Sequence, residues 1–297
     1  MLKRLILVGT LVIACLAGLS STSWAWGRQG HRIVARIAAK SIDAPTRSKI
    51  AAIFGTADTV SAVESAMADA SVWPDQIDKV ATGTREWHFI NASVSTPFSA
   101  AGLCSAHNCV IDRIEEMQTR LRNNQKGFKL LTAPMPNRPM LSREVAFLIH
   151  FVGDIHQPLH AATNSDFGGV GVHLTVPIQH GQFATMNLHA VWDDDEVFEV
   201  LNVLGNETQT AQVLFQRIQN GAMVTQASPV DWAHESNDLA KQDVYGKLSI
   251  ANHKVTVTQA YLQSNEADVE RQLMRAGIRL ARLLNDMCQG TGCKAKP

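Results

Sequence analysis

The sequence lacks three features that would place it in a simple class. It has no excess of positive charge, because 27 lysine and arginine residues balance 27 aspartate and glutamate residues. A protein that coats nucleic acid would be basic, so any binding of nucleic acid here must be local, with metal ions as a possible source of positive charge. It also has no internal repeat or low-complexity tract, and nothing in its 297 residues looks like a linker. That length fits one large domain or two small ones.

Long apolar runs are missing too, except at the N-terminus. Leu5 to Leu19 is an apolar stretch that follows the basic residues Lys3 and Arg4. The stretch is short for a membrane span of about 20 residues, and no later segment approaches that length. Small residues at two positions of Ser23-Trp24-Ala25 complete the pattern of a secretory signal peptide. We therefore predict that residues 1–25 are a signal peptide.

A second cleavage position lies inside the same stretch. Val12-Ile13-Ala14-Cys15 resembles a bacterial lipoprotein cleavage site, which would leave a lipidated Cys15 at the N-terminus instead of Trp26. Cleavage there would leave a very short apolar region, so cleavage after Ala25 is favoured. The mature chain is then expected to be a single catalytic domain of residues 26–297, secreted or periplasmic.

Cysteine is scarce, and its positions are informative. Of five cysteines, Cys15 leaves with the signal peptide, and the other four form two close pairs, Cys104/Cys109 and Cys288/Cys293. An even number of cysteines in an exported protein predicts disulfides. The alternative is a zinc site of four thiolates, for which the two pairs would have to meet in space.

The hydrophobic pattern is mostly helical. Ile33, Val34 and Ile37 repeat at helical spacing within the segment 30–40. Cap signals predict two further helices, one that begins near Ala44-Pro45 with Asp43 as its cap, and one capped by Ser142 and ended by Pro158. The other expected helices span about 108–123, 193–203, 208–221, 237–248 and 255–286.

One segment has a different pattern. Val170 to Leu188 alternates around Gly181 and is rich in valine, threonine and phenylalanine, which predicts a short hairpin. The fold class is therefore all-α, a compact multi-helix domain with a small β-hairpin.

Two histidine–aspartate pairs are candidate metal ligands. His150 and Asp154 are four residues apart, as are His189 and Asp193, which places both members of a pair on one helical face. A single such pair is more often a salt bridge than a metal site. Imidazole and carboxylate together, without thiolate, suit zinc in a hydrolytic site.

The surroundings of these pairs favour metal binding. His150 lies in the apolar run Phe147 to Val152, so its pair is expected inside the fold, where ionisable groups need partners. Further candidates are His31, Asp75, His88 and His160. His107, His180, His234 and His253 lack this context and are interpreted as surface residues.

Five segments resemble one known family. They are Trp26-Gly-Arg-Gln-Gly-His31, Trp73-Pro-Asp75, Trp87-His88-Phe89, His150-Phe-Val-Gly-Asp154-Ile-His-Gln-Pro-Leu-His160 and Asn187-Leu-His189-Ala-Val-Trp-Asp193. In this order they are similar to the zinc-dependent single-strand nucleases of the S1/P1 type, which are related in fold to bacterial zinc phospholipase C. The spacing differs between His160 and His189. The resemblance covers about residues 26–290.

The resemblance implies a site with three zinc ions, two of which share Asp154 as a bridging ligand. Its implied ligands are Asp75, His88, His150 and Asp154 for one ion; His160, His189 and Asp193 for a second; and His31, Asp154 and the amino and carbonyl groups of Trp26 for the third. The ligand role of Trp26 requires cleavage directly before it. An α-amine with a pKa near 8 loses its proton easily to a metal ion. His156 is not a ligand in this scheme and is interpreted as a residue that orients one.

The resemblance also implies the reaction. A hydroxide that bridges two zinc ions would attack phosphorus in single-stranded DNA, RNA or 3′-nucleotides and leave 5′-phosphate products. Phe89 would stack on a base, although core packing explains it nearly as well. The expected protein is a monomer without stable membrane association.

Three positions depart from the family pattern. Asp78 stands where the family commonly has an arginine that faces the phosphate, so that role is absent or has moved, with Lys79 and Arg85 as the nearby candidates. Asn91 stands in place of a base-reading aspartate, and Val170 follows Gly168-Gly169 in place of asparagine. Two alternatives therefore remain open: a phospholipase C-like phosphoesterase on the same zinc site, and a zinc-binding protein that has lost activity.

Overall fold

The computed structural model describes residues 26–78, 83–104, 108–124, 140–177, 182–221 and 225–294. The predicted signal peptide, Lys79, His107 and His180 lie outside these residues.

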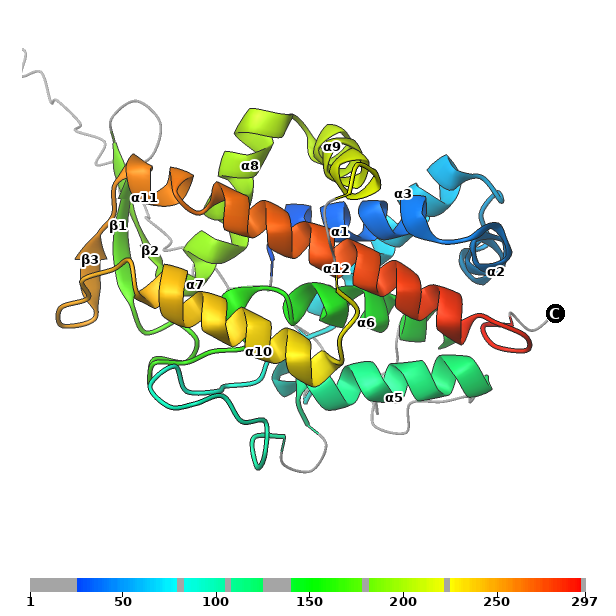
Figure 1. Cartoon of the computed structure of the whole chain (residues 1–297), viewed down its shortest axis with the longest axis horizontal. Coiled ribbons are helices and arrows are strands. Elements are labelled where there is room, and N and C mark those ends of the chain that lie inside the picture. The colour runs from blue at the N-terminus through cyan, green and yellow to red at the C-terminus, as the bar shows by residue number, and fades with distance from the viewer. Residues whose placement is uncertain are drawn as a thin grey trace, which may run out of the picture.

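Helices make up most of the described chain, which confirms the predicted fold class (Figure 1). Their bounds are α1 (Arg28–Ser41), α2 (Ala44–Phe54), α3 (Val60–Ser71), α4 (Trp73–Asp78), α5 (Val110–Asn123), α6 (Met140–Asp154), α7 (Leu188–Ala190), α8 (Glu196–Leu204), α9 (Glu207–Gln219), α10 (Pro229–Leu239), α11 (Gln259–Gln263) and α12 (Glu266–Met287). Short 3₁₀ helices cover Arg85–His88 and Pro158–His160, and π-helical turns cover Val191–Asp195 and Ala240–Tyr245.

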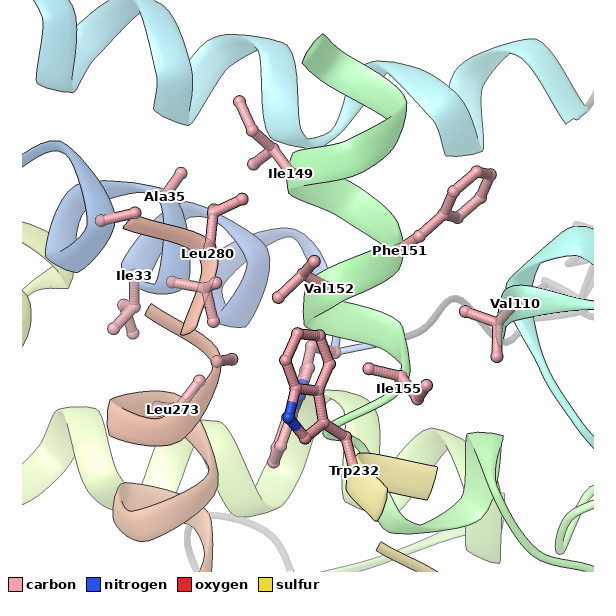
Figure 2. Packing of buried hydrophobic residues seen from close by; sticks show 14 of the residues in the cluster. Ile33, Ala35, Val110, Ile149, Phe151, Val152, Ile155, Trp232, Leu273 and Leu280 are labelled. Atoms are coloured by element: carbon pink, nitrogen blue, oxygen red, sulfur yellow. The ribbon is translucent and has the colours of Figure 1, made fainter. Parts of the chain in front are cut away.

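Helix α6 is at the centre of the hydrophobic core. It packs against α1, α3, α5 and α12, and its apolar side chains from Val145 to Val152 are fully buried. Figure 2 shows α6 between residues of α1 and α12 on one side and Val110 of α5 on the other. This helix carries two of the predicted ligands, so the core itself positions them.

Local signals explain where several helices begin. Asp43 caps α2 by accepting a hydrogen bond from Thr46 N at 2.7 Å, as predicted. The predicted cap at Ser142 is wrong, because α6 already includes Met140 and Ser142 lies inside its first turn. The same helix ends at Asp154, and Pro158 instead begins the following 3₁₀ turn.

Two other helix predictions are wrong in their bounds. The helix expected to begin at residue 237 begins instead at Pro229, because Ser228 and Asp231 form a capping box there. The segment expected at 255–286 is divided into a strand and two helices, because Thr258 caps α11. Helix α3 was not predicted, although Thr59 caps it. Its alanine- and serine-rich sequence gives little contrast between two faces.

The sheet lies at one end of the molecule, opposite the C-terminus (Figure 1). Strand β1 (His173–Pro177) pairs antiparallel with β2 (Phe183–Asn187), which confirms the predicted hairpin. A third strand, β3 (Lys254–Thr256), pairs parallel with β1. The hairpin leads directly into α7, which carries His189.

Both predicted disulfides are present. Cys104 is bonded to Cys109 and Cys288 to Cys293. The thiolate zinc alternative is therefore wrong, because a disulfide sulfur is no longer a thiolate. Among the described helices, none is both long and apolar enough to cross a membrane.

Close packing of α1 on α12 depends on Gly277. A Cβ atom at this position would lie 2.5 Å from Ile37 Cγ2 and 2.6 Å from Ile37 Cβ. We expect Gly277→Ala to lower the free energy of unfolding by about 1–3 kcal/mol in urea denaturation, because overpacking outweighs the better helix propensity of alanine. The exposed control Gln216→Ala on α9 should change it by less than about 0.5 kcal/mol. If Gly277→Ala and the unchanged chain had the same free energy of unfolding, α1 would be able to shift away from the added methyl group without loss of stability.

Candidate metal centre

The residues predicted as side-chain ligands come from separate segments and meet in the interior. His31 is on α1, Asp75 on α4, and His88 ends a 3₁₀ helix. The remaining ones lie on or just after α6, or on and just after α7: His150, Asp154, His160, His189 and Asp193. They form three groups whose ligand atoms lie within 4.8 Å of one another: His31, Asp75 and His150; His88, His150 and Asp154; and His160, His189 and Asp193.

Asp154 joins the first two groups. Its Oδ1 lies 3.2 Å from His31 Nε2, and its Oδ2 lies 3.0 Å from His88 Nδ1. His150 Nε2 lies 3.1 Å from Asp75 Oδ1 and 3.4 Å from Asp154 Oδ1. The two oxygens of this fully buried carboxylate thus face different imidazoles, which is the arrangement that a bridging ligand needs.

The third group holds two imidazoles and one carboxylate. His160 Nε2 and His189 Nε2 lie 3.0 Å apart, and Asp193 Oδ2 lies 3.5 Å from His189 Nε2. The other oxygen of Asp193 accepts a hydrogen bond from Gln157 Nε2 at 2.6 Å. Gln157 Oε1 in turn accepts one from Leu159 N. Gln157, which sequence reasoning missed, therefore fixes the carboxylate.

Backbone carbonyls decide which ring nitrogens can bind a metal ion. His150 Nδ1 donates to Ser71 O at 2.7 Å, and His189 Nδ1 donates to Gly168 O at 2.6 Å. In the same way, His160 Nδ1 donates to His88 O at 2.6 Å. In each neutral ring the proton is on Nδ1, so Nε2 carries a lone pair.

This assignment produces a conflict that a cation would relieve. In the third group, two Nε2 lone pairs face each other at 3.0 Å inside the protein. Burial lowers the pKa of His160 to about 3 and that of His189 to about 4, with the neighbouring imidazole adding to the effect for His160. Both rings are therefore neutral at physiological pH and available to a metal ion. The donor set fits a divalent metal ion that accepts nitrogen and oxygen ligands.

The first two groups have a different charge state. Burial alone would raise the pKa of Asp154, but the imidazoles of His150, His31 and His88 outweigh it and hold the pKa well below its usual range. Burial alone would lower the pKa of His150, but Asp154 and Asp75 outweigh it and raise the pKa to about 9. The carboxylates are thus ionised and the centre attracts positive charge.

Glycine makes room for the rings. A Cβ atom at Gly153 would lie 2.6 Å from His31 Nδ1, so a side chain there would displace this ring. His31 stacks on His150 with ring centroids 3.9 Å apart. Trp26 is fully buried, and Gly27 N next to it donates to Asp193 O at 2.8 Å. The start of the described chain is therefore fixed against the centre.

The residues predicted to contact substrate lie close to His88 in the sequence. Arg85 and Asn91 are exposed and Phe89 is partly buried, all within seven residues around His88. Asp78 ends α4, and Lys79 lies outside the described residues. His156 is not among the gathered ligands, as predicted, but the prediction that it orients one is wrong, because its Nδ1 donates to Val152 O and its Nε2 accepts from Arg279. Both ring nitrogens are engaged away from the ligands.

Distant helices hold the turn that connects Asp154 to His160. Ser236 Oγ donates to Ile155 O, Gln272 Nε2 to His156 O, and Asn237 Nδ2 to Ala161 O. Sequence reasoning missed these three residues, because they follow their partners by 76 to 116 positions and match no motif.

Gln157 gives a direct test of the third group. We expect Gln157→Leu to weaken metal binding there by about 10- to 100-fold, because Asp193 loses the donor that orients it. Competition with a chromophoric chelator measures the affinity. The control Gln216→Leu lies exposed on α9 and should leave it unchanged. If Gln157→Leu binds metal with unchanged affinity, the hydrogen bond from Gln157 is not needed to orient Asp193.

Known proteins match nearly the whole described chain. A family model described as S1/P1 Nuclease matches residues 26–289. Nuclease S1 of Aspergillus oryzae is 26% identical over 92% of this chain and 96% of its own length. Endonuclease 5 of Arabidopsis thaliana is 27% identical over 95% of this chain and 96% of its own length. Nuclease P1 of Penicillium citrinum is 24% identical over 88% of this chain and 97% of its own length. The chain therefore belongs to the S1/P1 nuclease family and acts on nucleic acid.

Proposed function

We propose that this nuclease is an exported, zinc-dependent enzyme that hydrolyses single-stranded DNA and RNA and also 3′-nucleotides, with 5′-phosphate products. The observation that carries the proposal is the pair of buried Nε2 lone pairs of His160 and His189, 3.0 Å apart, in a centre that also contains buried carboxylates. Nitrogen and carboxylate donors without thiolate are typical of zinc in hydrolytic sites.

Three zinc ions account for all nine proposed ligands. Asp75, His88, His150 and Asp154 would hold one ion; His160, His189 and Asp193 a second; and His31, Asp154 and the mature N-terminus at Trp26 a third. Bound zinc lowers the pKa of water toward about 7 and withdraws charge from phosphate oxygens.

The residues of this chain prepare the centre for that chemistry. The carbonyls of His88 and Gly168 hold the neutral rings of His160 and His189 in the Nδ1-protonated form, so no proton blocks their Nε2 lone pairs. Ser71 O holds the Nδ1 proton of His150 in the same way, and a metal ion would displace the proton that its raised pKa keeps on Nε2. Asp154 presents one oxygen to each side of the centre. Burial of these groups keeps bulk water away, so that solvent screens their electrostatic interaction with a phosphodiester only weakly.

Residues next to His88 in the sequence would select single strands. Phe89 follows His88 directly and is partly exposed, which suits stacking on an unpaired base. Exposed Asn91 can both donate to and accept from a base edge. Arg85 is the proposed phosphate contact in place of the arginine that the Asp78 position lacks, with Lys79 as the alternative.

One experiment tests metal dependence and activity together. We expect about three zinc ions per correctly processed chain by metal analysis, and digestion of denatured DNA and RNA that stops on chelation and returns with zinc. Asp154→Asn should lower the rate at least about 100-fold, because the bridging carboxylate loses its charge. Asp238→Asn is the matched control: His234 and Asp238 have the same spacing, but both side chains are about half exposed.

Each alternative predicts a different outcome. Zinc-loaded protein that leaves both polymers intact would contradict the proposal and favour a zinc-binding protein without activity. Release of phosphocholine from short-chain lipids without nuclease activity would favour a phospholipase C-like esterase.

The N-terminus gives a second, independent prediction. Intact-mass analysis of exported protein should place the first residue at Trp26. A variant with extra residues before Trp26 should bind about two zinc ions and lose at least about tenfold in rate, because its α-amino group is no longer there to bind. A C-terminal tag is the control. Full zinc content in the N-terminally extended protein would remove Trp26 from the ligand set.

A further inference from the structure

Arg279 is a fully buried arginine on α12. Its Nη1 and Nη2 donate to the two oxygens of Glu235 at 2.8 and 2.9 Å, and its Nε donates to Thr225 O at 3.2 Å. Its Cζ lies 5.5 Å from the centre of the Trp232 ring. Because it is costly to remove a guanidinium from water, these partners both offset its burial and fix its place in the core.

A further donation from this guanidinium goes to His156, which follows Asp154 by two residues. Arg279 Nη1 donates to His156 Nε2 at 2.9 Å, and His156 Nδ1 donates to Val152 O at 2.7 Å. Trp232 packs beside the imidazole, with ring centres 5.4 Å apart, and Figure 2 shows it between α12 and the end of α6. The ring of His156 therefore connects α12 to the last turn of α6.

The way in which α6 ends gives this ring its role. In a regular α-helix the carbonyl of Val152 would accept from the backbone N–H of His156. His156 N donates instead to Gly153 O at 3.1 Å, and Gln157 N donates to Asp154 O at 2.9 Å, because the chain tightens as it leaves the helix. The imidazole of His156 replaces its own N–H as the partner of Val152 O. The orientation of the ring therefore sets the direction in which the chain leaves Asp154.

Helix α12 holds the same residue at a second point. Gln272 Nε2 donates to His156 O at 2.8 Å. Gln272 precedes Arg279 by seven residues, so both side chains lie on one face of α12, and both are buried. The next residue in the turn, Gln157, donates to Asp193. A rotation of the chain at His156 would therefore reach the third group of ligands.

We propose that Arg279 is a positioning residue of the nuclease reaction, which acts through the His156 imidazole to set the spacing between Asp154 and the third group of ligands. This inference rests on the proposed function. Hydrolysis at adjacent metal ions requires a definite geometry of the ligands, so a turn that can leave α6 in several directions lowers the rate even when every ligand is present.

Arg279→Met tests the proposal, because it keeps most of the side-chain volume but donates no hydrogen bond. We expect its zinc Kd, measured by competition with a chromophoric chelator, to rise about 10- to 100-fold. At saturating zinc, kcat on a single-stranded oligonucleotide should fall by a similar factor, while KM changes less than about threefold, because the geometry of the centre is altered and substrate binding is not. In cobalt(II)-substituted protein the visible absorption bands should shift, since they report the geometry of the ligands.

A second background separates positioning from a general loss of stability. If Arg279 acts through the ring, adding Arg279→Met to His156→Leu should change the zinc Kd by less than about twofold, whereas independent effects would multiply. The control Arg282→Met replaces an exposed arginine three residues later on the same helix and should change neither the zinc Kd nor the cobalt spectrum. Urea unfolding of each variant shows that it is folded under the assay conditions.

Arg279→Met leaves Glu235 without its main partner, which can prevent folding. In that case Arg279→Met is combined with Glu235→Leu, because removal of both charges of an ion pair costs less than removal of one. The donor to His156 is still absent, so the same rise in zinc Kd and the same shift of the cobalt bands are expected.

The possible failures are distinguishable. If the unchanged enzyme digests single strands and the Arg279 variant has the same zinc Kd, kcat and cobalt spectrum, the inference is wrong and the proposed function stands. If Arg279→Met weakens zinc binding by the same factor in the His156→Leu background, its effect does not pass through the ring and the inference is also wrong. If the unchanged, zinc-loaded chain digests no single strand, the proposed function fails and takes the inference with it.

Discussion

The structure depends on one electrostatic constraint: imidazole lone pairs and ionised carboxylates are gathered in the protein interior with little exposure to solvent. His160 and His189 face each other through Nε2 at 3.0 Å, and Asp154 is fully buried among three imidazoles. Such groups repel or cost desolvation energy unless cations or partners offset them. Backbone carbonyls make the arrangement specific, because each fixes the proton of one ring on Nδ1 and aims the other nitrogen inward.

Helix packing and hydrogen bonds from distant segments position the residues of this centre. Helix α6 carries His150 and Asp154 in the middle of the core, so their positions are set by packing on four other helices. The turn after α6 is held by Ser236, Asn237 and Gln272, which come from α10 and α12. A change in helix packing far from the ligands therefore reaches the candidate metal centre through these hydrogen bonds.

Electrostatic attraction for nucleic acid is not spread over the surface of this chain. The chain as a whole has no net charge, so positive charge for a phosphodiester would have to come from metal ions in the candidate centre. Phe89 follows the candidate ligand His88 directly and is partly exposed. Stacking on an aromatic ring distinguishes unpaired from paired bases without reading a base sequence.

The sequence by itself determined the helical class, the hairpin and both disulfide pairs, because periodicity, alternation and close cysteines are local signals. A spacing of four residues also marked His150 with Asp154 and His189 with Asp193 as candidate ligands, whereas the other candidates rested on the family resemblance. Tertiary structure alone decided what depends on contacts between distant segments. The pairing of β3 with β1, the engagement of His156 by Arg279, and the carbonyl that fixes each imidazole have no local signature. The start near Ser142 was wrong because capping residues occur inside helices as well as before them. The start at 237 was wrong because the capping box of Ser228 and Asp231 was not recognised. The buried position of Arg279 is likewise a property of the folded chain, since an arginine in the sequence suggests only an exposed side chain.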